Sequence, residues 1–314
     1  MEQARIRFSY LAWAVLAFTV LVILGGAIVR ATGSGDGCGD TWPVCADRIF
    51  PANAGIETMI EYGHRLMSGA AIIGIATLFF WSRRLYERGD LVRWGAAASV
   101  VLIVVESLIG ATLVLFGWVD DDESVARVFA VALHLVNTMF LLAALTVTAW
   151  WSSGNPEPRV AEHGMEPRRL ALGAAGLVVV AAAGALNALA DTLYPADDFL
   201  SGVRDELTAG APWLVQARIL HPMVAILVGI GVAYLAVTMS AGSGPSTQRL
   251  GRFIVGLVIV QFAIGITNVL LATPLETQIV HLAMADAIWI AFVLFAASLL
   301  SEPVAAVEKA VSRT

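Results

Sequence analysis

Four histidines are the residues of this chain whose type and spacing suggest chemistry. The sequence has only five histidines among 314 residues, and these four lie in or next to long apolar runs: His64, His134, His221 and His281. Ionisable side chains are rare in such runs and usually mark function. Two imidazoles from different helices can hold a haem iron from both faces. The pattern therefore favours two bis-histidine haem sites, while hydrogen bonding between helices and zinc or copper binding remain alternatives.

The surroundings of the histidines limit these alternatives. Zinc is the weaker one because no third or fourth ligand is evident near either histidine pair. The fifth histidine, His163, lies in a polar linker, where we expect a solvated surface position. Glycines in the apolar runs would let a flat ligand approach, although tight helix packing explains them equally well: Gly25, Gly26, Gly69, Gly110, Gly184 and Gly265.

The segment before His64 carries the only two cysteines of the chain, Cys38 and Cys45. Flexible glycine lies between them, so a disulfide can close this loop in an oxidising compartment. A structural staple and a redox-active pair that exchanges with an external thiol carrier both remain open. Glu61 stands three residues before His64, on the same face of a helix. Its carboxylate could transfer protons near a haem edge, or it could be an acidic residue favoured by the helix macrodipole.

Membrane helices must position these residues, because the chain is 58% hydrophobic and only 14% charged. Its mean hydropathy is +0.79, and soluble domains carry about 25% charged residues. Soluble, secreted and disordered proteins are therefore excluded, and we predict an all-α integral membrane protein. We expect the first apolar stretch to be a retained helix, since no convincing cleavage site follows it. Eight stretches can span a bilayer as helices and are too uniform for barrel strands: about 9–29, 64–81, 95–116, 127–150, 170–190, 213–239, 252–272 and 279–300.

The basic residues predict the orientation, because short cytoplasmic loops are enriched in arginine and lysine. One side holds most of them, and we assign it to the cytoplasm with both termini: Arg5, Arg7, Arg83, Arg84, Arg88, Arg93, Arg159, Arg168, Arg169, Arg249, Arg252, Lys309 and Arg313. The other side holds Arg30, Arg48, Arg65, Arg127, Arg204 and Arg218. The cysteine loop and the four histidines then face the extracytoplasmic side. The net charge of −6 reflects acidic outer loops and does not indicate a nucleic-acid partner.

An internal repeat divides the chain into two halves. Residues 103–112 and 258–267 match at a constant offset, and similar offsets connect other positions. The matched pairs include Glu106 with Gln261, Gly110 with Gly265, Gly26 with Gly184, His64 with His221, and His134 with His281. Four spans return the chain to its starting side, so we predict two tandem, pseudo-symmetric four-helix bundles in parallel orientation. The polar linker 152–169 contains the boundary, giving domains 1–160 and 161–314.

Other polar residues in the apolar runs allow more than one role. Glu106 and Asp286 could belong to a proton path, but a hydrogen bond between helices explains Glu106 equally well. Asn137 is expected to bind a neighbouring helix. Arg218 stands where the first half has Glu61, and it could pair with a haem propionate or a lipid phosphate. Pro222 should kink its helix and aim the preceding histidine.

Several of these segments together resemble the haem A synthase family. They are the glycine-containing run 25–35, the Cys38–Cys45 loop that ends in Trp-Pro-Val-Cys, the Glu61-x-x-His64-Arg65 motif, and one histidine in each of the fourth, sixth and eighth spans. The resemblance covers nearly the whole chain. It implies an enzyme of the cytoplasmic membrane that oxidises the C8 methyl group of haem o to the formyl group of haem a, for terminal oxidase assembly.

The resemblance also implies roles for residues and partners. It assigns the substrate haem to His64 and His134, a haem b cofactor with its iron to His221 and His281, catalysis to Glu61, and the family's first-loop cysteine pair to Cys38 and Cys45. Haem o synthase, cytochrome oxidase assembly proteins, membrane lipid and an electron donor that the sequence does not identify are the implied partners. Many bacterial members have a second cysteine pair, whereas residues 191–213 contain none, which puts an electron route through two cysteine pairs in doubt.

Two other classes of protein fit the histidine pairs. A quinol-linked dihaem b-type cytochrome would keep two chemically identical haems bound. A haem transporter or chaperone would use the same ligands but would need a release path and no catalytic glutamate. The position of Glu61 beside His64, together with cysteines in only one half, favours the synthase.

Overall fold

The computed structural model describes residues 1–45, 51 and 54–303, and this part of the chain contains helices and no strand. Eight helical segments are long and apolar enough to cross a membrane. They are α1 (Glu2–Ala31), α2 (Ile56–Leu85), α3 (Leu91–Leu115), α4 (Val125–Ser152), α5 (Glu166–Leu193), the segment Trp213–Ser240, α9 (Pro245–Leu270) and α10 (Leu275–Ser301). The prediction of an all-helical, multi-pass membrane protein with eight candidate spans is confirmed.

Several helices extend beyond the apolar stretches that predicted them. Helix α2 begins at Ile56 and not near residue 64, so Glu61 lies inside the helix, about one turn before His64. Asp90 and Ser124 each accept a hydrogen bond from a backbone N–H in the first turn of α3 and α4. These side chains satisfy donors that a helix start leaves free. Capping thus fixes where two of the predicted spans begin.

The sixth span is interrupted directly before His221. It consists of α7 (Trp213–Gln216), the 3-10 turn η2 (Ala217–Ile219) and α8 (Leu220–Ser240). A proline ring clashes with the carbonyl group four residues earlier, which for Pro222 is that of Arg218. A tighter 3-10 turn replaces the α-helical bonds there. The sequence predicted a kink at Pro222, and the structure has a 3-10 turn at Ala217–Ile219, just before α8 begins.

Two short helices in the loops were not predicted. One is the 3-10 turn η1 (Val160–Glu162) in the linker, and the other is α6 (Phe199–Leu207) between α5 and α7. At the start of α6, Ser201 N donates to Asp198 Oδ1 at 2.8 Å, and Asp198 N donates to Ser201 Oγ at 3.0 Å. This capping box orders the outer loop of the second half, which has no cysteines.

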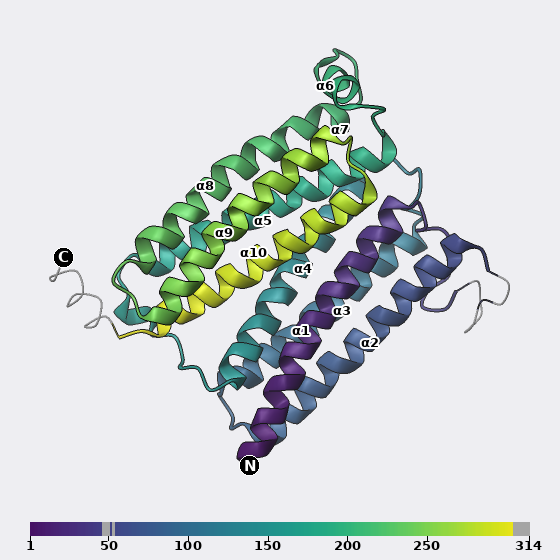
Figure 1. Ribbon diagram of the computed structural model, residues 1–314. Coiled ribbons are helices and arrows are strands. Elements are labelled where there is room, and N and C mark those ends of the chain that lie inside the picture. The colour runs from purple at the N-terminus through teal and green to yellow at the C-terminus, as the bar shows by residue number, and fades with distance from the viewer. Residues whose placement is uncertain (46–50, 52–53, 304–314) are drawn as a thin grey trace.

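The spans lie side by side along one long axis (Figure 1). Among the first four, α1 contacts α2 and α4, and α3 contacts α2 and α4. Among the last four, α5 contacts α8 and α10, and α9 contacts α8 and α10. Helices α4 and α5, α4 and α10, and α1 and α10 also touch, so the two sets share a contact surface. Helix α1 begins and α10 ends at the same end of the molecule, opposite α6 and α7 (Figure 1).

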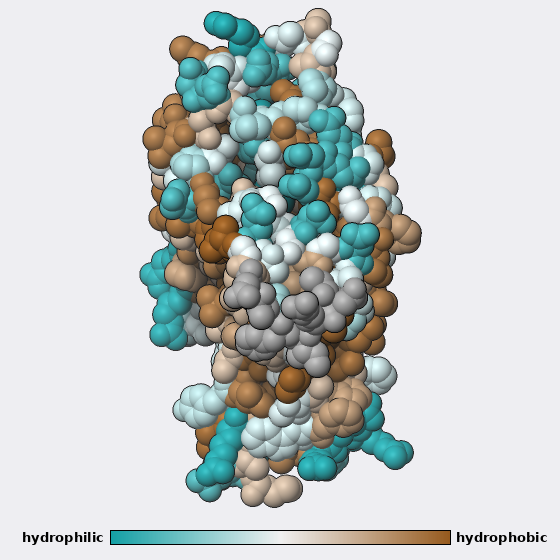
Figure 2. Space-filling view, turned by 90° about the vertical axis from the view of Figure 1, so that its right-hand side faces the viewer, coloured by the Kyte–Doolittle hydropathy of each residue, from teal (hydrophilic) through white to brown (hydrophobic). Residues whose placement is uncertain are grey.

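Helices α4 and α10 form the centre of the protein. Half of the apolar window of α4 is buried, which is the largest share of any span. Trp289 on α10 packs with buried residues of α1 to α4, and its Nε1 donates to Met139 O on α4 at 2.7 Å. The remaining helices leave large apolar side chains exposed, and hydrophobic residues line both flanks of the molecule in Figure 2. Such surfaces suit contact with lipid acyl chains.

The linker between the two sets of spans returns to the end of α10. Arg159 N donates to Leu300 O at 2.7 Å, and His163 Nε2 lies 3.1 Å from Glu302 O. His163 is only 5% exposed. The expectation of a solvated His163 was therefore wrong, because the linker packs this side chain against the end of a span. Arg48, Lys309 and Arg313, used to predict orientation, lie outside the described residues.

We expect Gly251→Ala to destabilise the protein, because α9 packs on α8 at this residue without room for a side chain. A Cβ atom there would lie 2.8 Å from the backbone oxygen of Ala236 and 2.9 Å from Ser240 Oγ. Overpacking of this kind costs about 1–3 kcal/mol. Thermal unfolding in detergent measures the effect. Gly256→Ala on the same helix is the matched control, since its Cβ would meet no atom within 4 Å, and equal unfolding temperatures for both variants would contradict the packing.

Candidate functional site

The two histidines of the second half face each other. His221 lies at the start of α8 and His281 near the start of α10, with ring centroids 6.3 Å apart and ring planes at 79°. A bond between an imidazole nitrogen and a metal is about 2 Å long. Two rings that bind one haem iron from opposite faces therefore have centroids roughly 6 Å apart. The spacing of His221 and His281 fits this arrangement.

One contact of His281 defines the tautomer that suits a metal. Gln261 Nε2 lies 3.3 Å from His281 Nε2 and 3.2 Å from His281 O. An amide N–H that donates to Nε2 leaves the imidazole proton on Nδ1. In this tautomer the Nε2 lone pair can bind iron once the amide moves aside.

The two histidines of the first half lie on different helices, His64 on α2 and His134 on α4. The Nδ1 atoms of all four histidines are buried with no hydrogen-bond partner in the described part of the chain, and His134 Nδ1 is among them. Buried polar atoms without partners are uncommon and need an explanation such as a missing ligand. No group of three or more metal-binding side chains occurs among the described residues. At most two such side chains therefore group together in this part of the chain, a number that haem iron accepts and tetrahedral zinc does not prefer.

Each histidine ring lies against a glycine of a neighbouring helix. A Cβ on these glycines would approach the ring carbon Cε1 at 3.0 to 3.7 Å, which leaves little or no room for a larger side chain. The pairs are Gly26 with His64, Gly110 with His134, Gly184 with His221, and Gly265 with His281. These are the glycines that the repeat aligned, so the close approach of a ring to a helix backbone recurs in both halves.

The histidines of α4 and α10 have different polar neighbours. Glu106 Oε1 lies 3.4 Å from His134 Nδ1, whereas Gln261 occupies the corresponding place beside His281. Asn137 Nδ2 donates to Leu102 O at 3.0 Å and to Glu106 Oε2 at 2.5 Å. Asn137 therefore binds a neighbouring helix, as predicted, and Glu106 joins α3 to α4.

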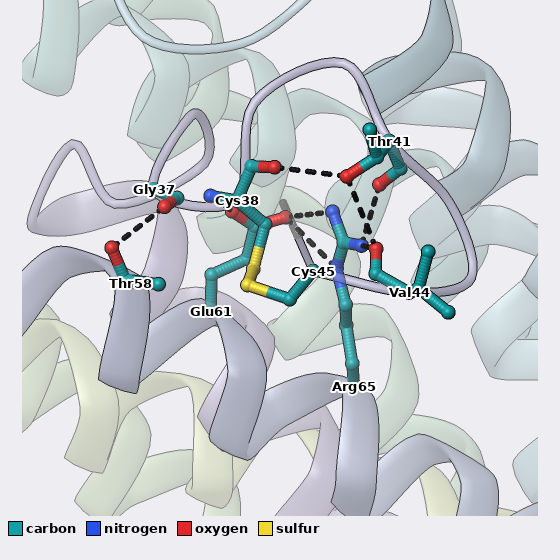
Figure 3. A network of polar contacts seen from close by, with 8 residues as sticks. All are labelled: Gly37, Cys38, Thr41, Val44, Cys45, Thr58, Glu61 and Arg65. Carbon is teal, nitrogen blue, oxygen red and sulfur yellow. Dashed lines mark hydrogen bonds and ion pairs between the residues drawn. A yellow bond between two sulfur atoms is a disulfide. The ribbon is translucent and has the colours of Figure 1, made fainter. Parts of the chain in front are cut away.

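A hydrogen-bond network closes the cysteine loop over the start of α2 (Figure 3). Cys38 and Cys45 form a disulfide, as predicted, and each is 1% exposed. Thr58 Oγ1 donates to Gly37 O at 2.7 Å. A Cβ on Gly37 would lie 2.6 Å from the Glu57 carbonyl carbon. The loop therefore packs directly on the backbone of α2.

Arg65 joins this loop to Glu61 (Figure 3). Its Nη1 donates to Thr41 O at 2.6 Å and to Val44 O at 2.5 Å. Its Nε and Nη2 donate to Glu61 Oε1 at 3.0 and 2.5 Å. Charge-assisted hydrogen bonds of this kind are stronger than neutral ones. One guanidinium group thus holds both the loop and the carboxylate in place.

Both carboxylate oxygens of Glu61 have partners. Oε2 accepts a hydrogen bond from Cys38 N at 2.7 Å, and Oε1 binds Arg65. The residue is 3% exposed and is the sixth residue of α2, while the macrodipole acts within the first turn. The loop and Arg65, and not the macrodipole, therefore fix Glu61 about one turn from His64.

The corresponding position of the second half holds a different ion pair. Arg218 Nε lies 3.1 Å from Asp191 Oδ1, and its Nη2 donates to the backbone oxygens of Ala190 at 2.6 Å and Tyr194 at 2.5 Å. Arg218 is 6% exposed. Arg218 therefore has protein partners in Asp191 and the end of α5, and its pairing with a haem propionate or a lipid phosphate stays a prediction.

Two contacts join the outer ends of the halves. Arg30 on α1 donates through Nη1 to a backbone oxygen and to Thr192 Oγ1 of α5, each at 2.5 Å. Its Nη2 donates to Gln278 Oε1 of α10 at 3.0 Å. Between the loops, the Tyr194 hydroxyl is hydrogen-bonded to Glu123, which raises the pKa of Tyr194. The end of α1 and both outer loops are thereby connected.

The sequence reasoning missed several partners of the candidate residues. The sequence did indicate Arg65 as a partner of Glu61, because the two residues are four apart and face each other on a helix. The sequence did not indicate Asp191 as the partner of Arg218, since the loop that contains α6 separates the two residues. Asp286 is 5% exposed, and its Oδ2 has no hydrogen bond among the described residues. Its part in a proton path stays a prediction.

The facing pair His221 and His281, in a helical membrane protein with a disulfide-closed outer loop, defines a candidate membrane haem protein. The family comparison agrees with this class. The chain belongs to the COX15-CtaA family, described as cytochrome oxidase assembly protein, whose model matches residues 9–293.

Individual relatives support the resemblance to the haem A synthase family. A protein from Thermus thermophilus named protoheme IX farnesyltransferase is 42% identical over 303 residues, which are 96% of this chain and 50% of that protein. Heme A synthases from Alkalihalophilus pseudofirmus and Halalkalibacterium halodurans are 38% and 36% identical, over 41% and 44% of this chain and 41% and 45% of theirs. The chain thus spans half or less of the length of these relatives.

We expect Arg65→Gln to expose the disulfide to added reductant. The variant loses the ion pair with Glu61 and hydrogen bonds to the loop, each worth about 0.5–1.5 kcal/mol. Loss of two such bonds corresponds to roughly tenfold faster reduction by dithiothreitol through a loop that opens more often. Maleimide labelling of the released thiols measures the rate. Arg84→Gln, at an exposed arginine near the other end of α2, is the control, and equal rates in both variants would refute the role of Arg65.

Proposed function

We propose that this chain is a haem A synthase, an oxidoreductase that converts the C8 methyl group of haem o to the formyl group of haem a. The observation that carries the proposal is the repeated arrangement of a histidine pair between glycine-bearing helices, with a buried glutamate beside only one pair. Membership of the COX15-CtaA family and the heme A synthases among its relatives support the same activity.

We also propose that the chain forms two tandem four-helix bundles, from domains 1–160 and 161–314. The helix contacts within the first four and the last four spans support this division. The glycine–histidine contacts support the pseudo-symmetry, because each one in the first half has a counterpart in the second. The basic residues support cytoplasmic termini in the cell membrane, with the cysteine loop and the histidines toward the extracytoplasmic side.

The two halves would have different tasks. His221 and His281 would hold haem b, which supplies one-electron redox chemistry when bound. His64 and His134 would hold the substrate haem o. A binding role for the second half is supported by Arg218, which stands three residues before His221, where the first half has Glu61, and which is paired with Asp191.

Glu61 would accept protons released as the methyl group is oxidised. Arg65 and the Cys38 backbone hold its carboxylate at the outer end of α2, about one turn from His64. The disulfide-closed loop covers this carboxylate and keeps it from bulk water. A positioned carboxylate in such a site can act as a general base.

A farnesyl-transferring enzyme is a reasonable partner. The Thermus protein that contains a sequence like this one is about twice as long as the matched region, and it is named protoheme IX farnesyltransferase. Haem o synthase would supply the farnesylated substrate. We propose that such an enzyme delivers haem o to this chain within the membrane, and that cytochrome oxidase assembly proteins receive haem a.

Pigment analysis tests the activity. We expect membranes that contain this protein and a haem o source to yield haem a or its hydroxylated precursor, and membranes without the haem o source to yield only haem b. If only haem b is extracted in both cases, the protein is not a synthase. Two unchanged haems would then favour a dihaem cytochrome.

Substitutions test the assignment of the two halves. His221→Ala or His281→Ala should deplete haem b, because one axial ligand is lost. Glu61→Gln should retain haem b and slow oxidation roughly 100-fold or more, the usual contribution of a general base. His163→Gln is the control, since His163 lies in the linker against the end of α10 and should leave haem content unchanged. Loss of haem b from the Glu61 variant would reverse the assignment.

A further inference from the structure

We propose that Glu106 is a positioning residue that makes the two histidine pairs chemically unequal. Its carboxylate would orient His134 as an iron ligand, while Gln261 leaves the corresponding His281 beside a neutral amide. This inference rests on the proposed function, in which His134 holds the substrate haem and His281 holds haem b.

Glu106 is held in a polar cluster beside His134. Its Oε1 lies 3.4 Å from His134 Nδ1 and accepts a hydrogen bond from Thr138 Oγ1. Its Oε2 accepts a hydrogen bond from Asn137 Nδ2 at 2.5 Å. Asn137 and Thr138 lie on α4 within about one turn of His134, and Thr138 Oγ1 also donates to His134 O at 2.9 Å. The carboxylate is thus fixed relative to the histidine that it faces.

The second half lacks this cluster at the same place. Gln261 contacts His281 through its amide nitrogen, and its Oε1 is buried with no hydrogen-bond partner in the described part of the chain. Met284 and Ala285 stand three and four residues after His281, where the first half has an amide and a hydroxyl. His134 therefore has a charged neighbour, Glu106, whose two oxygens are hydrogen-bonded. The equivalent His281 has a neutral neighbour, Gln261, whose oxygen is not.

A carboxylate near a ligating imidazole has a defined effect on the metal. When it accepts the Nδ1–H, it fixes the tautomer with Nε2 toward the metal, orients the ring and raises the basicity of the ligand. Gln261 does not act in this way, because its amide nitrogen faces His281 Nε2 and not Nδ1. An iron held by His134 would therefore be stabilised in its ferric state relative to an iron held by His281.

Redox titration and electron paramagnetic resonance of protein loaded with haem b and haem o in lipid nanodiscs test this inference. In Glu106→Gln, we expect the haem o midpoint potential to rise and its low-spin ferric signal to shift, with the haem b signal unchanged. Glu106→Asp should restore the wild-type signal in part. A variant that only loosened packing would lose haem or stability without moving the potential of one haem selectively.

The reciprocal variant Gln261→Glu keeps the test decisive if Glu106→Gln does not retain haem o. It places a carboxylate beside His281 and should lower the potential of haem b alone. If Glu106→Gln binds haem o, unchanged potentials and signals in that variant would overturn the inference. If it does not bind haem o, an unchanged haem b potential in Gln261→Glu would overturn it. Wild-type protein that binds haem b but no haem o would instead refute the proposed function, and the positioning role with it.

Discussion

Polar groups inside a bilayer have no water to bind, so each one in these spans needs a partner on the protein or on a ligand. Most polar side chains satisfy this requirement through a neighbouring helix, as Asn137 does with α3 and Trp289 does with α4. The histidine rings are different. Each ring lies against a glycine of a neighbouring helix, and its Nδ1 atom is buried without a hydrogen bond in the described part of the chain. Buried polar atoms without a partner among the described residues also occur on Tyr86, Trp150 and Asp286, so the glycine contact, and not the missing bond, distinguishes the histidine rings.

Buried arginines organise the outer end of the molecule. Arg65 binds the cysteine loop, Arg127 binds the backbone oxygens of Asp120 and Asp122, and Arg218 binds the end of α5. Each guanidinium group comes from a helix and holds the carbonyl groups of a loop or a helix end. Several backbone acceptors around one planar cation fix a loop more firmly than neutral contacts would. The loops that cover the histidines thus depend on charges carried by the helices beneath them.

Most of the fold could be predicted from the sequence, because long apolar runs require helices in a bilayer and their boundaries follow from polar interruptions. The helix start at Ile56 was missed, since the first turns of α2 contain acidic residues and are not apolar enough to be recognised as part of a membrane span. The disulfide was predictable from the only two cysteines. The partners of Glu61, Glu106 and Arg218 were not all predictable, because helix packing brings together residues far apart in the chain. His163 was misplaced for the same reason: a polar linker gives no sign that it folds back on α10.

The contacts of Arg30 show that the packing of the first helix depends on helices that are synthesised later. The residue belongs to the first helix, yet its partners are Thr192 on the fifth span and Gln278 on the last. While the chain is being inserted, the outer end of α1 must keep its guanidinium group hydrated, since no protein acceptor has been made. Arrival of α5 and then α10 closes this end. The first helix therefore reaches its final state only when the last one is in the membrane, and a chain truncated before α10 would lack Gln278, the partner of Arg30 Nη2.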